Sequence, residues 1–431
     1  MASRRFPARG LPLLYLGTAH VSLALAFLLA ACWPWAVAGF FYHAWLVGLV
    51  HLVTIGWISF SILGAFFIVA PLALRAEMAV RRVDYVAFAF ALIGLVGMVG
   101  HFWIQQFSGM AWSAATVAGG ILYMTVRIAG RALRAGVHPA VKTHIVLACV
   151  NLWLAASMGL LLAFDKFLHF LPGFVLSNVF AHAHLAALGW AAMMVIGIAY
   201  RMLPMFLPSK LPSGRTLFAS AAALEAGVLG LFVTLLMRSR LAAGFGALIV
   251  AAMILFAGHV VWMRRHLVSK PVDAPRVDFG ILHAAGAGLW LVVAAALGMS
   301  LLILPPSQVT LRLAAAYGVA GLVGFLAQIV VAMESRLLPL VAWYWTYESE
   351  GFAVAPPSPH VMRDRALQAI AFAGWTLGVP ALASGMFIES GRLVGAGAWL
   401  LFASVALTAL DNALVVGRSF ARLRRQARFA A

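Results

Sequence analysis

One apolar pattern occurs three times in this chain, at separations of 133 and 135 residues and with no internal gap. The copies begin at His51, His184 and Val319, and each is 22 residues long. Solenoid repeats have periods of about 20–50 residues, so the longer period here indicates that a whole helical bundle is repeated. The matching columns are His51, His184 and Val319; Gly56, Gly189 and Gly324; Trp57, Trp190 and Phe325; Gly64, Gly197 and Ala332; and Pro71, Pro204 and Pro339.

Composition places this repeated bundle in a membrane. Hydrophobic residues make up 64% of the chain and charged residues only 10%. Long apolar runs recur throughout, and each can cross a bilayer core of about 30 Å. The repeat segments fall in the second, sixth and tenth runs, which are the longest. The twelve predicted spans lie near 11–31, 43–74, 84–104, 111–131, 141–164, 174–207, 215–237, 242–263, 279–303, 311–345, 366–388 and 393–417.

Twelve spans and three copies give four helices per copy. An even number of helices returns the chain to the same side, so the copies are parallel rather than inverted. We therefore predict an all-α polytopic membrane protein, with three parallel four-helix arcs related by pseudo-threefold symmetry. The chain forms a single membrane domain over residues 1–431, and its internal repeats cover 11–131, 141–263 and 279–417.

Basic residues predict the orientation of this bundle in the bilayer. If the N-terminus is cytoplasmic, 25 of the 30 Lys and Arg residues fall on the cytoplasmic side. This asymmetry is a strong positive-inside signal, and it makes both termini cytoplasmic in a bacterial-type inner membrane. It also accounts for the net charge of +18 without a nucleic-acid partner, because charge that binds nucleic acid has no reason to follow alternate loops.

The second copy of the repeat contains two histidines, His182 and His184, at membrane depth. Residues two apart on a helix point about 200° apart, so these side chains face different crevices and cannot chelate one ion together. That geometry suits two planar cofactors on either side of one helix. A low-spin haem takes an axial imidazole from each of two facing helices, and His51 is the symmetry-matched partner for His184. The alternative is that both histidines hydrogen-bond to neighbouring carbonyls in a packed bundle.

Other polar groups at membrane depth supply further candidates. His182 would be the proximal ligand of a second haem, and His20, His43 and His101 would supply copper or nonhaem iron opposite it. Glu225 and Glu334 are candidates for a proton path.

Glu334 has a second interpretation, as the partner of a basic side chain. Arg201 and Arg336 occupy one column of the repeat, and either could pair with the Glu334 carboxylate.

The stretch AHAHLAALGWAAMMVIGIAYRMLPMF, residues 181–206, resembles the haem-binding helix of heme-copper oxidase catalytic subunits, a superfamily that includes nitric oxide reductases. The likeness is greatest to the cbb-type branch. The resemblance implies that His182 holds a high-spin haem and His184 a low-spin haem. It also implies a second low-spin ligand from the second helix, which His51 or His43 would supply, and twelve helices in three arcs.

The chain departs from that family in two ways. The two histidines lie on the sixth helix rather than the tenth, and the seventh helix, LFASAAALEAGVLGLFVTLL from Leu217, lacks the family's adjacent copper-binding histidine pair. The chain also resembles the NnrS-type membrane haem proteins linked to nitric-oxide tolerance, on twelve spans and the run YHAWLVGLVHL from Tyr42.

These observations predict a haem-binding membrane redox protein with one or two b-type haems. It would perform electron transfer or small-gas chemistry on nitric oxide or oxygen, with a cytochrome or quinol as electron donor and with partner subunits. Whether it turns over as an oxidoreductase stays open, because the usual copper site is missing. The alternatives are an NnrS-like nitric-oxide-stress protein without oxidase turnover, and a secondary transporter with three internal repeats.

Overall fold

The computed structural model describes residues 7–269, 277–347 and 358–429. Within these ranges all regular segments are helical, apart from one isolated bridge between Ser209 and Leu267. Twelve of the described helices are long and apolar enough to cross a membrane, and their limits agree closely with the predicted spans. The chain is a multi-pass, all-α membrane protein, as the composition predicts.

The spans form three arcs, each continuous in the chain. The first arc contains α1 (Gly10–Cys32), α2 (Pro34–Val37), a long span made of α3 (Ala44–His51), η1 (Leu52–Ser59) and α4 (Phe60–Leu72), then α5 (Arg82–Trp103) and α6 (Phe107–Leu133). The second contains α7 (Pro139–Leu168), a long span made of α8 (Val175–His184), η2 (Leu185–Ala192) and α9 (Met193–Phe206), then α10 (Gly214–Leu236) and α11 (Ala242–Arg265). The third contains α12 (Phe279–Ile303), a long span made of α13 (Gln308–Gly318), η3 (Val319–Ala327) and α14 (Gln328–Tyr347), the short η5 (Pro359–Met362), then α15 (Arg365–Phe387) and α16 (Gly391–Phe429).

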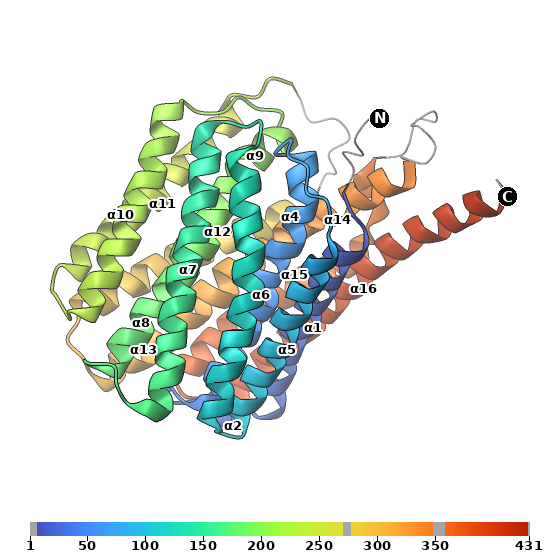
Figure 1. Cartoon of the computed structure of the whole chain (residues 1–431). Coiled ribbons are helices and arrows are strands. Elements are labelled where there is room, and N and C mark those ends of the chain that lie inside the picture. The colour runs from blue at the N-terminus through green and yellow to red at the C-terminus, as the bar shows by residue number, and fades with distance from the viewer. Residues whose placement is uncertain (1–6, 270–276, 348–357, 430–431) are drawn as a thin grey trace.

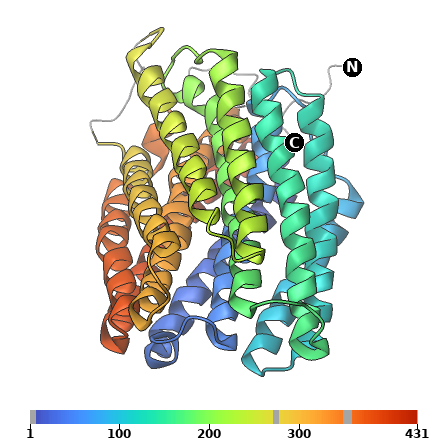
Figure 2. The ribbon, with the colours of Figure 1, turned by 90° about the vertical axis from the view of Figure 1, so that its left-hand side faces the viewer.

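The arcs close into a ring of helices (Figure 1). Helix α6 packs against α7, α11 against α12, and α16 against α1, so the last helix of each arc contacts the first helix of the next. The third and fourth spans of each arc form a tightly packed pair, and these pairs lie on the outside of the bundle (Figure 2). Both termini lie at one end, which we call the termini side; α2, α8 and α13 lie at the other end, the cavity side (Figure 1).

The three long spans meet at the centre of the ring through the same local distortion. Each contains a π-helical segment, η1, η2 or η3, at the same position of the repeat. These three segments contact one another pairwise, which places the pseudo-threefold axis between them. π-Helical turns inside α-helices are rare and occur frequently at functional sites.

Glycine at one repeat column lets each long span approach the first helix of its own arc. A Cβ on Gly56 would lie 2.5 Å from the Ser22 Cβ, and one on Gly189 would lie 2.8 Å from the Asn151 Cβ. A Cβ on Gly324 would lie 2.4 Å from the Trp290 ring, so all three positions exclude a side chain. The repeat therefore preserves one packing contact in all three arcs.

Two buried indoles join the arcs at the centre. Trp57 donates from Nε1 to the carbonyl oxygen of Ala327 at 3.1 Å, which links the first arc to the third. Trp190 donates from Nε1 to the Ser59 hydroxyl at 3.1 Å, which links the second arc to the first. A buried indole N–H needs an acceptor, so these residues fill the core and also fix the relative positions of the long spans.

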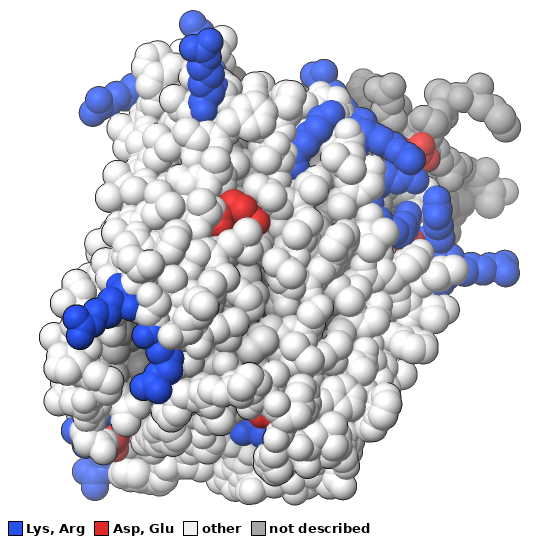
Figure 3. All heavy atoms as spheres, turned by 60° about the vertical axis from the view of Figure 1, so that its left-hand side comes forward, with Lys and Arg blue, Asp and Glu red and all other residues white. Residues whose placement is uncertain are grey.

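The outer surface suits a lipid environment. In Figure 3, basic side chains gather toward the two ends of the bundle, and the wide belt between them is uncharged apart from one acidic spot. Leu289 and Val292 of α12 illustrate this belt, since 63% and 66% of their respective side-chain surfaces are exposed. Exposed aliphatic side chains of this size are favourable against acyl chains.

Candidate cofactor cavity

The bundle encloses a cavity of about 1090 Å³ on its cavity side. All three arcs contribute to its wall, which is predominantly apolar. The polar exceptions are few and include His43, His51, His182, His184, Tyr317 and Lys166. A large apolar cavity with a few convergent polar groups is the usual form of a small-molecule or cofactor site.

The three histidines predicted to bind haem iron all line this cavity, and each is held by a backbone carbonyl. The Nδ1 atom of His51 donates to the Val47 oxygen at 2.8 Å, and that of His184 donates to the Phe180 oxygen at 2.7 Å. His182 donates from Nδ1 to the Ala155 oxygen at 2.9 Å. Because a carbonyl oxygen only accepts, the ring proton of each neutral imidazole is assigned to Nδ1. Nε2 is then the atom of each ring that carries a lone pair, the form in which an imidazole coordinates a metal, and in His184 this atom is also placed to accept from the Tyr317 hydroxyl at 3.0 Å.

The local backbone explains why His51 and His184 are positioned alike. Each ends an α-helical segment and directly precedes a π-helical segment. Each ring folds back onto the carbonyl four residues earlier, which is the neighbour on the same helix face. The third copy has Val319 in this column, so the third arc contributes no imidazole at this level.

His182 and His184 point toward different neighbours, as their spacing predicts. His182 faces α7, where it contacts the Ala155 carbonyl, and a Cβ on Gly159 would lie 2.8 Å from its ring. His184 faces α13, where its Nε2 lies 3.0 Å from the Tyr317 hydroxyl. The cavity therefore has an α7 side and an α13 side, and helix α8 carries an imidazole toward each.

The structure groups the predicted ligands differently from the predicted pairing of His184 with His51. The ring that stacks with His184 is that of Tyr317, with centroids 5.9 Å apart and planes 20° apart. His51 stacks on Phe102 of α5 at 5.6 Å, and it lies near enough to His182 that a charge on one ring would disfavour a charge on the other. His51 is thus grouped with His182, whereas His184 is grouped with Tyr317.

Tyr317 was not among the residues that the sequence singled out. It lies two residues before Val319, in the same repeat column as His182. Extending the repeat alignment two residues upstream of its first histidine would have placed a polar residue of the third arc beside the histidine pair. The signal was therefore present in the sequence, outside the aligned segment.

The outer end of the cavity contains a cation and a capping histidine. The Lys166 Nζ lies 4.3 Å from the centroid of the Tyr42 ring and 5.7 Å from that of Phe107, which are cation–π distances. His43 caps α3 by accepting from the Leu46 amide at 3.4 Å, and burial lowers the pKa of this imidazole. Lys166 offers a positive charge to a ligand with an acidic edge.

The structure does not bring His20, His43 and His101 together. His101 bonds from Nδ1 to the Gly97 oxygen at 2.6 Å and lies outside the cavity wall, and His20 belongs to a separate polar network. Among the described residues, no group of three or more His, Cys, Asp or Glu side chains is arranged to hold a metal ion.

The two predicted proton-path glutamates have different surroundings. Glu225 accepts from the Asn151 side chain at 2.7 Å. Glu334 accepts from the Ser61 hydroxyl at 3.1 Å and lies 3.3 Å from His20 Nε2.

The basic partners considered for Glu334 are engaged elsewhere. Arg201 donates to the Ala73 carbonyl at 2.5 Å, and Arg336 pairs with Asp278.

Comparison with known proteins supports the fold and leaves the function open. No family model matches the chain. No curated protein matches it either. A similar solved structure is a chain of a heme-copper terminal oxidase dimer determined by cryo-electron microscopy, with a TM-score of 0.63 and 10% sequence identity. The match covers 95% of this chain and 84% of that one, so the two share their fold over most of both chains.

Proposed function

We propose that this chain is a haem-binding membrane redox protein that holds one or two b-type haems in its cavity. The observation that carries the proposal is the set of three imidazoles, His51, His182 and His184, whose Nδ1 atoms are bound to carbonyls inside a large apolar cavity. This arrangement leaves Nε2 as the ligand atom and fixes the ring orientation, as second-shell bonds do for metal-binding histidines.

The cavity fits a haem in size and in chemistry. Its volume of about 1090 Å³ is at the upper end of the range for small-molecule sites. Its wall is mostly aliphatic and aromatic, which suits a porphyrin face, and Lys166 at the outer end suits the haem carboxylates. A haem iron supplies one-electron transfer and, where one axial position is open, binding of a gas such as nitric oxide or oxygen.

The grouping of residues assigns a role to each histidine. We assign His184 to a haem on the α13 side, where Tyr317 is the opposing polar group, and His182 with His51 to the α7 side. The fold's likeness to an oxidase supports a cavity for such cofactors, since a heme-copper terminal oxidase has the same architecture. His43 is a further candidate ligand at the outer end of the α7 side.

Charge asymmetry supports the membrane topology. With both termini in the cytoplasm, the cavity lies toward the outer face of a bacterial-type inner membrane. A cytochrome could then deliver electrons from the outside, or a quinol could deliver them from the lipid. Partner subunits would cover the exposed ends of the bundle.

Optical spectra of the purified protein test this proposal. After haem-replete expression, the dithionite-reduced protein should show b-type haem bands, and a pyridine haemochromogen assay should confirm them. His182→Ala and His51→Ala should alter one spectral component, and His184→Ala should alter another. His101→Ala is the matched control, because its Nδ1 makes the same kind of backbone bond outside the cavity.

Two results would contradict the assignment. A colourless wild-type protein would remove the redox function and favour transport through the cavity. The second is that His184→Ala and His51→Ala remove the same spectral component while His182→Ala affects a different one. That result would support the pairing of His184 with His51 that the repeat symmetry predicts. An NnrS-like role without oxidase turnover would show haem bands but no consumption of oxygen.

A further inference from the structure

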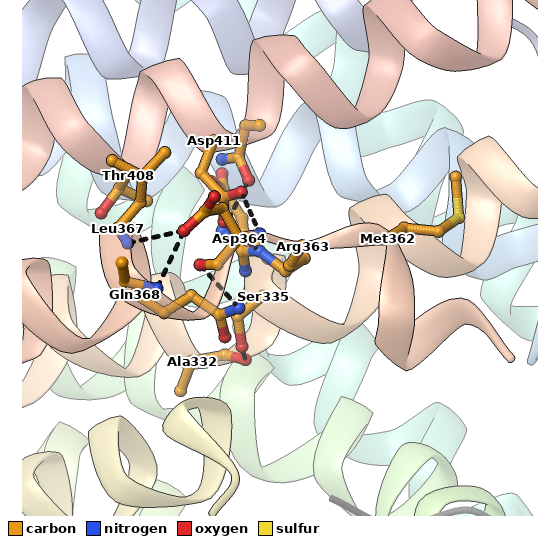
Figure 4. A network of polar contacts seen from close by, with 12 residues as sticks. Ala332, Ser335, Met362, Arg363, Asp364, Leu367, Gln368, Thr408 and Asp411 are labelled. Atoms are coloured by element: carbon orange, nitrogen blue, oxygen red, sulfur yellow. Dashed lines mark hydrogen bonds and ion pairs between the residues drawn. The ribbon is translucent and has the colours of Figure 1, made fainter.

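A chain of buried polar side chains lies on the termini side of the cavity and touches none of the three cavity imidazoles. It runs from Arg363 through Asn412 and His20 to Glu334 and Ser61. This network of side chains joins the segment before α15 to helices α16, α1, α14 and α4. Figure 4 shows its beginning, where Arg363 and Asp364 converge on Asp411.

Arg363 fixes the orientation of the Asn412 amide. Its guanidinium donates from Nε to Asp411 at 2.6 Å and from Nη2 to the Asn412 Oδ1 at 2.9 Å. A guanidinium has no acceptor, so the oxygen of Asn412 must face it. The Asn412 NH₂ group therefore points in the opposite direction, toward His20.

The fixed amide determines which nitrogen of His20 carries the proton. Asn412 Nδ2 lies 3.2 Å from His20 Nε2, and His20 Nδ1 lies 2.9 Å from the Leu16 carbonyl oxygen. The amide donates to Nε2, and Nδ1 donates to the carbonyl, so the hydrogen-bond network requires a neutral imidazole with its lone pair on Nε2.

Glu334 faces this lone pair. Its Oε2 lies 3.3 Å from His20 Nε2, and both side chains are buried, with exposures of 3% for Glu334 and 7% for His20. A carboxylate oxygen and an imidazole lone pair would repel each other at this distance in a site without solvent. A proton on Oε2 removes this repulsion, because Oε2–H and the Asn412 amide can then share the Nε2 lone pair as donors, while Oε1 still accepts from Ser61.

We propose that Glu334 is a neutral carboxylic acid that donates its proton to His20, and that this pair is a buried proton-binding site beneath the cavity. Arg363 makes no ion pair with Glu334: its guanidinium pairs with Asp411, and Asn412 and His20 lie between it and the Glu334 carboxyl group. Among the described residues, His20 is the one basic side chain within ion-pair distance of Glu334, so when His20 is neutral a proton on Glu334 removes an otherwise unpaired buried charge.

The position of the Glu334–His20 pair relative to the cofactor cavity suits a role in supplying protons, and this role rests on the proposed redox function. Ser61 lies two residues, or about 3 Å along the helix, beyond Ser59, which lines the cavity. At the other end, Arg363, Asp411, His283 and Ser335 line a small cavity of about 10 Å³, close to the volume that one water molecule needs. The pair therefore lies between the cofactor cavity and a small polar cavity on the termini side.

Infrared spectroscopy of the purified full-length chain tests the proposal with or without bound haem. We expect a C=O stretching band of a protonated carboxyl group that shifts in D₂O and disappears in Glu334→Gln. His20→Asn retains a group near Nδ1 but removes the Nε2 acceptor, so it should move the band, whereas His20→Gln places an amide near Nε2 and should move it less. Glu225→Gln is the matched control and should leave this component in place.

An unchanged carboxyl region in Glu334→Gln would overturn the proposal, because Glu334 would then be ionised. A Glu334 band that does not respond to His20→Asn would also overturn it, because the proton would not be shared with His20. The band is independent of the haem bands. A haem-containing protein without it refutes only the proton site, and a colourless protein that retains it refutes only the redox function.

Discussion

The cavity side and the termini side of this bundle use histidine for different purposes. His51 and His20 both donate from Nδ1 to the carbonyl four residues earlier, at 2.8 Å and 2.9 Å. The surroundings of their Nε2 atoms differ. His51 lines a large cavity, whereas His20 Nε2 lies between Asn412 and Glu334. A hydrogen bond from Nδ1 to a carbonyl therefore does not by itself identify a cofactor ligand. A candidate ligand must also line a cavity large enough for the cofactor.

This difference predicts that the termini side contributes most to stability. Arg363→Ala should leave the buried Asp411 carboxylate without its ion partner, and breaking such a pair costs about 3–5 kcal/mol. Thermal unfolding in detergent measures the loss. Arg312→Ala is the control, since its pair with Glu389 is exposed and should be worth about 0–1 kcal/mol. Equal effects of the two substitutions would contradict the contrast between the two sides.

On the cavity side, the same kind of substitution should affect the cofactor rather than the fold. His182→Ala removes one hydrogen bond, from Nδ1 to Ala155, which contributes about 0.5–1.5 kcal/mol. We expect the haem-free protein to unfold close to the wild-type temperature, while the spectral component assigned to the α7 side is lost. A large drop in stability with intact spectra would show that His182 is a packing residue.

Glu334→Gln should be tolerated if the acid is neutral. The glutamine amide can donate to His20 Nε2 and accept from Ser61, so we expect a change of no more than about 1 kcal/mol. Thermal unfolding alongside Arg363→Ala gives the comparison. A loss as large as that of Arg363→Ala would show that Glu334 is a carboxylate paired with a charged His20.

Tyr317→Phe should have the smallest effect on the optical spectra. It removes the hydroxyl that lies 3.0 Å from His184 Nε2 and leaves the ring stacking in place, at a cost of about 0.5–1.5 kcal/mol. Optical spectra should shift only in the component that depends on His184. A shift in the component that depends on His182 would contradict the separation of the cavity into two sides.

Periodicity and hydrophobicity were sufficient to predict the architecture. The three-copy repeat and the apolar runs predicted twelve spans in three arcs, and the structure confirms that fold. The separation of His182 from His184 also followed from helix geometry alone, because it depends only on residues two apart. The exact division of the chain into repeats at 131, 141, 263 and 279 stays a prediction.

The contacts between arcs could not be predicted, because they depend on how distant helices face each other. His20 and Asn412 are 392 residues apart, and His184 and Tyr317 are 133 apart. Symmetry suggested His51 as the partner of His184, but the third arc supplies Tyr317 on that side. The apolar pattern likewise could not predict the π-helical segments, because a π-helical turn needs no distinctive residue.

Haem content tests the central claim most directly. We would measure the haem bound per chain in the wild-type protein and in the His182→Ala, His184→Ala double variant, both purified after haem-replete expression. The account predicts b-type haem in the wild-type protein and its loss from the double variant, whose helices remain folded by circular dichroism. A folded wild-type protein without haem, or a double variant that retains the full amount, would contradict it.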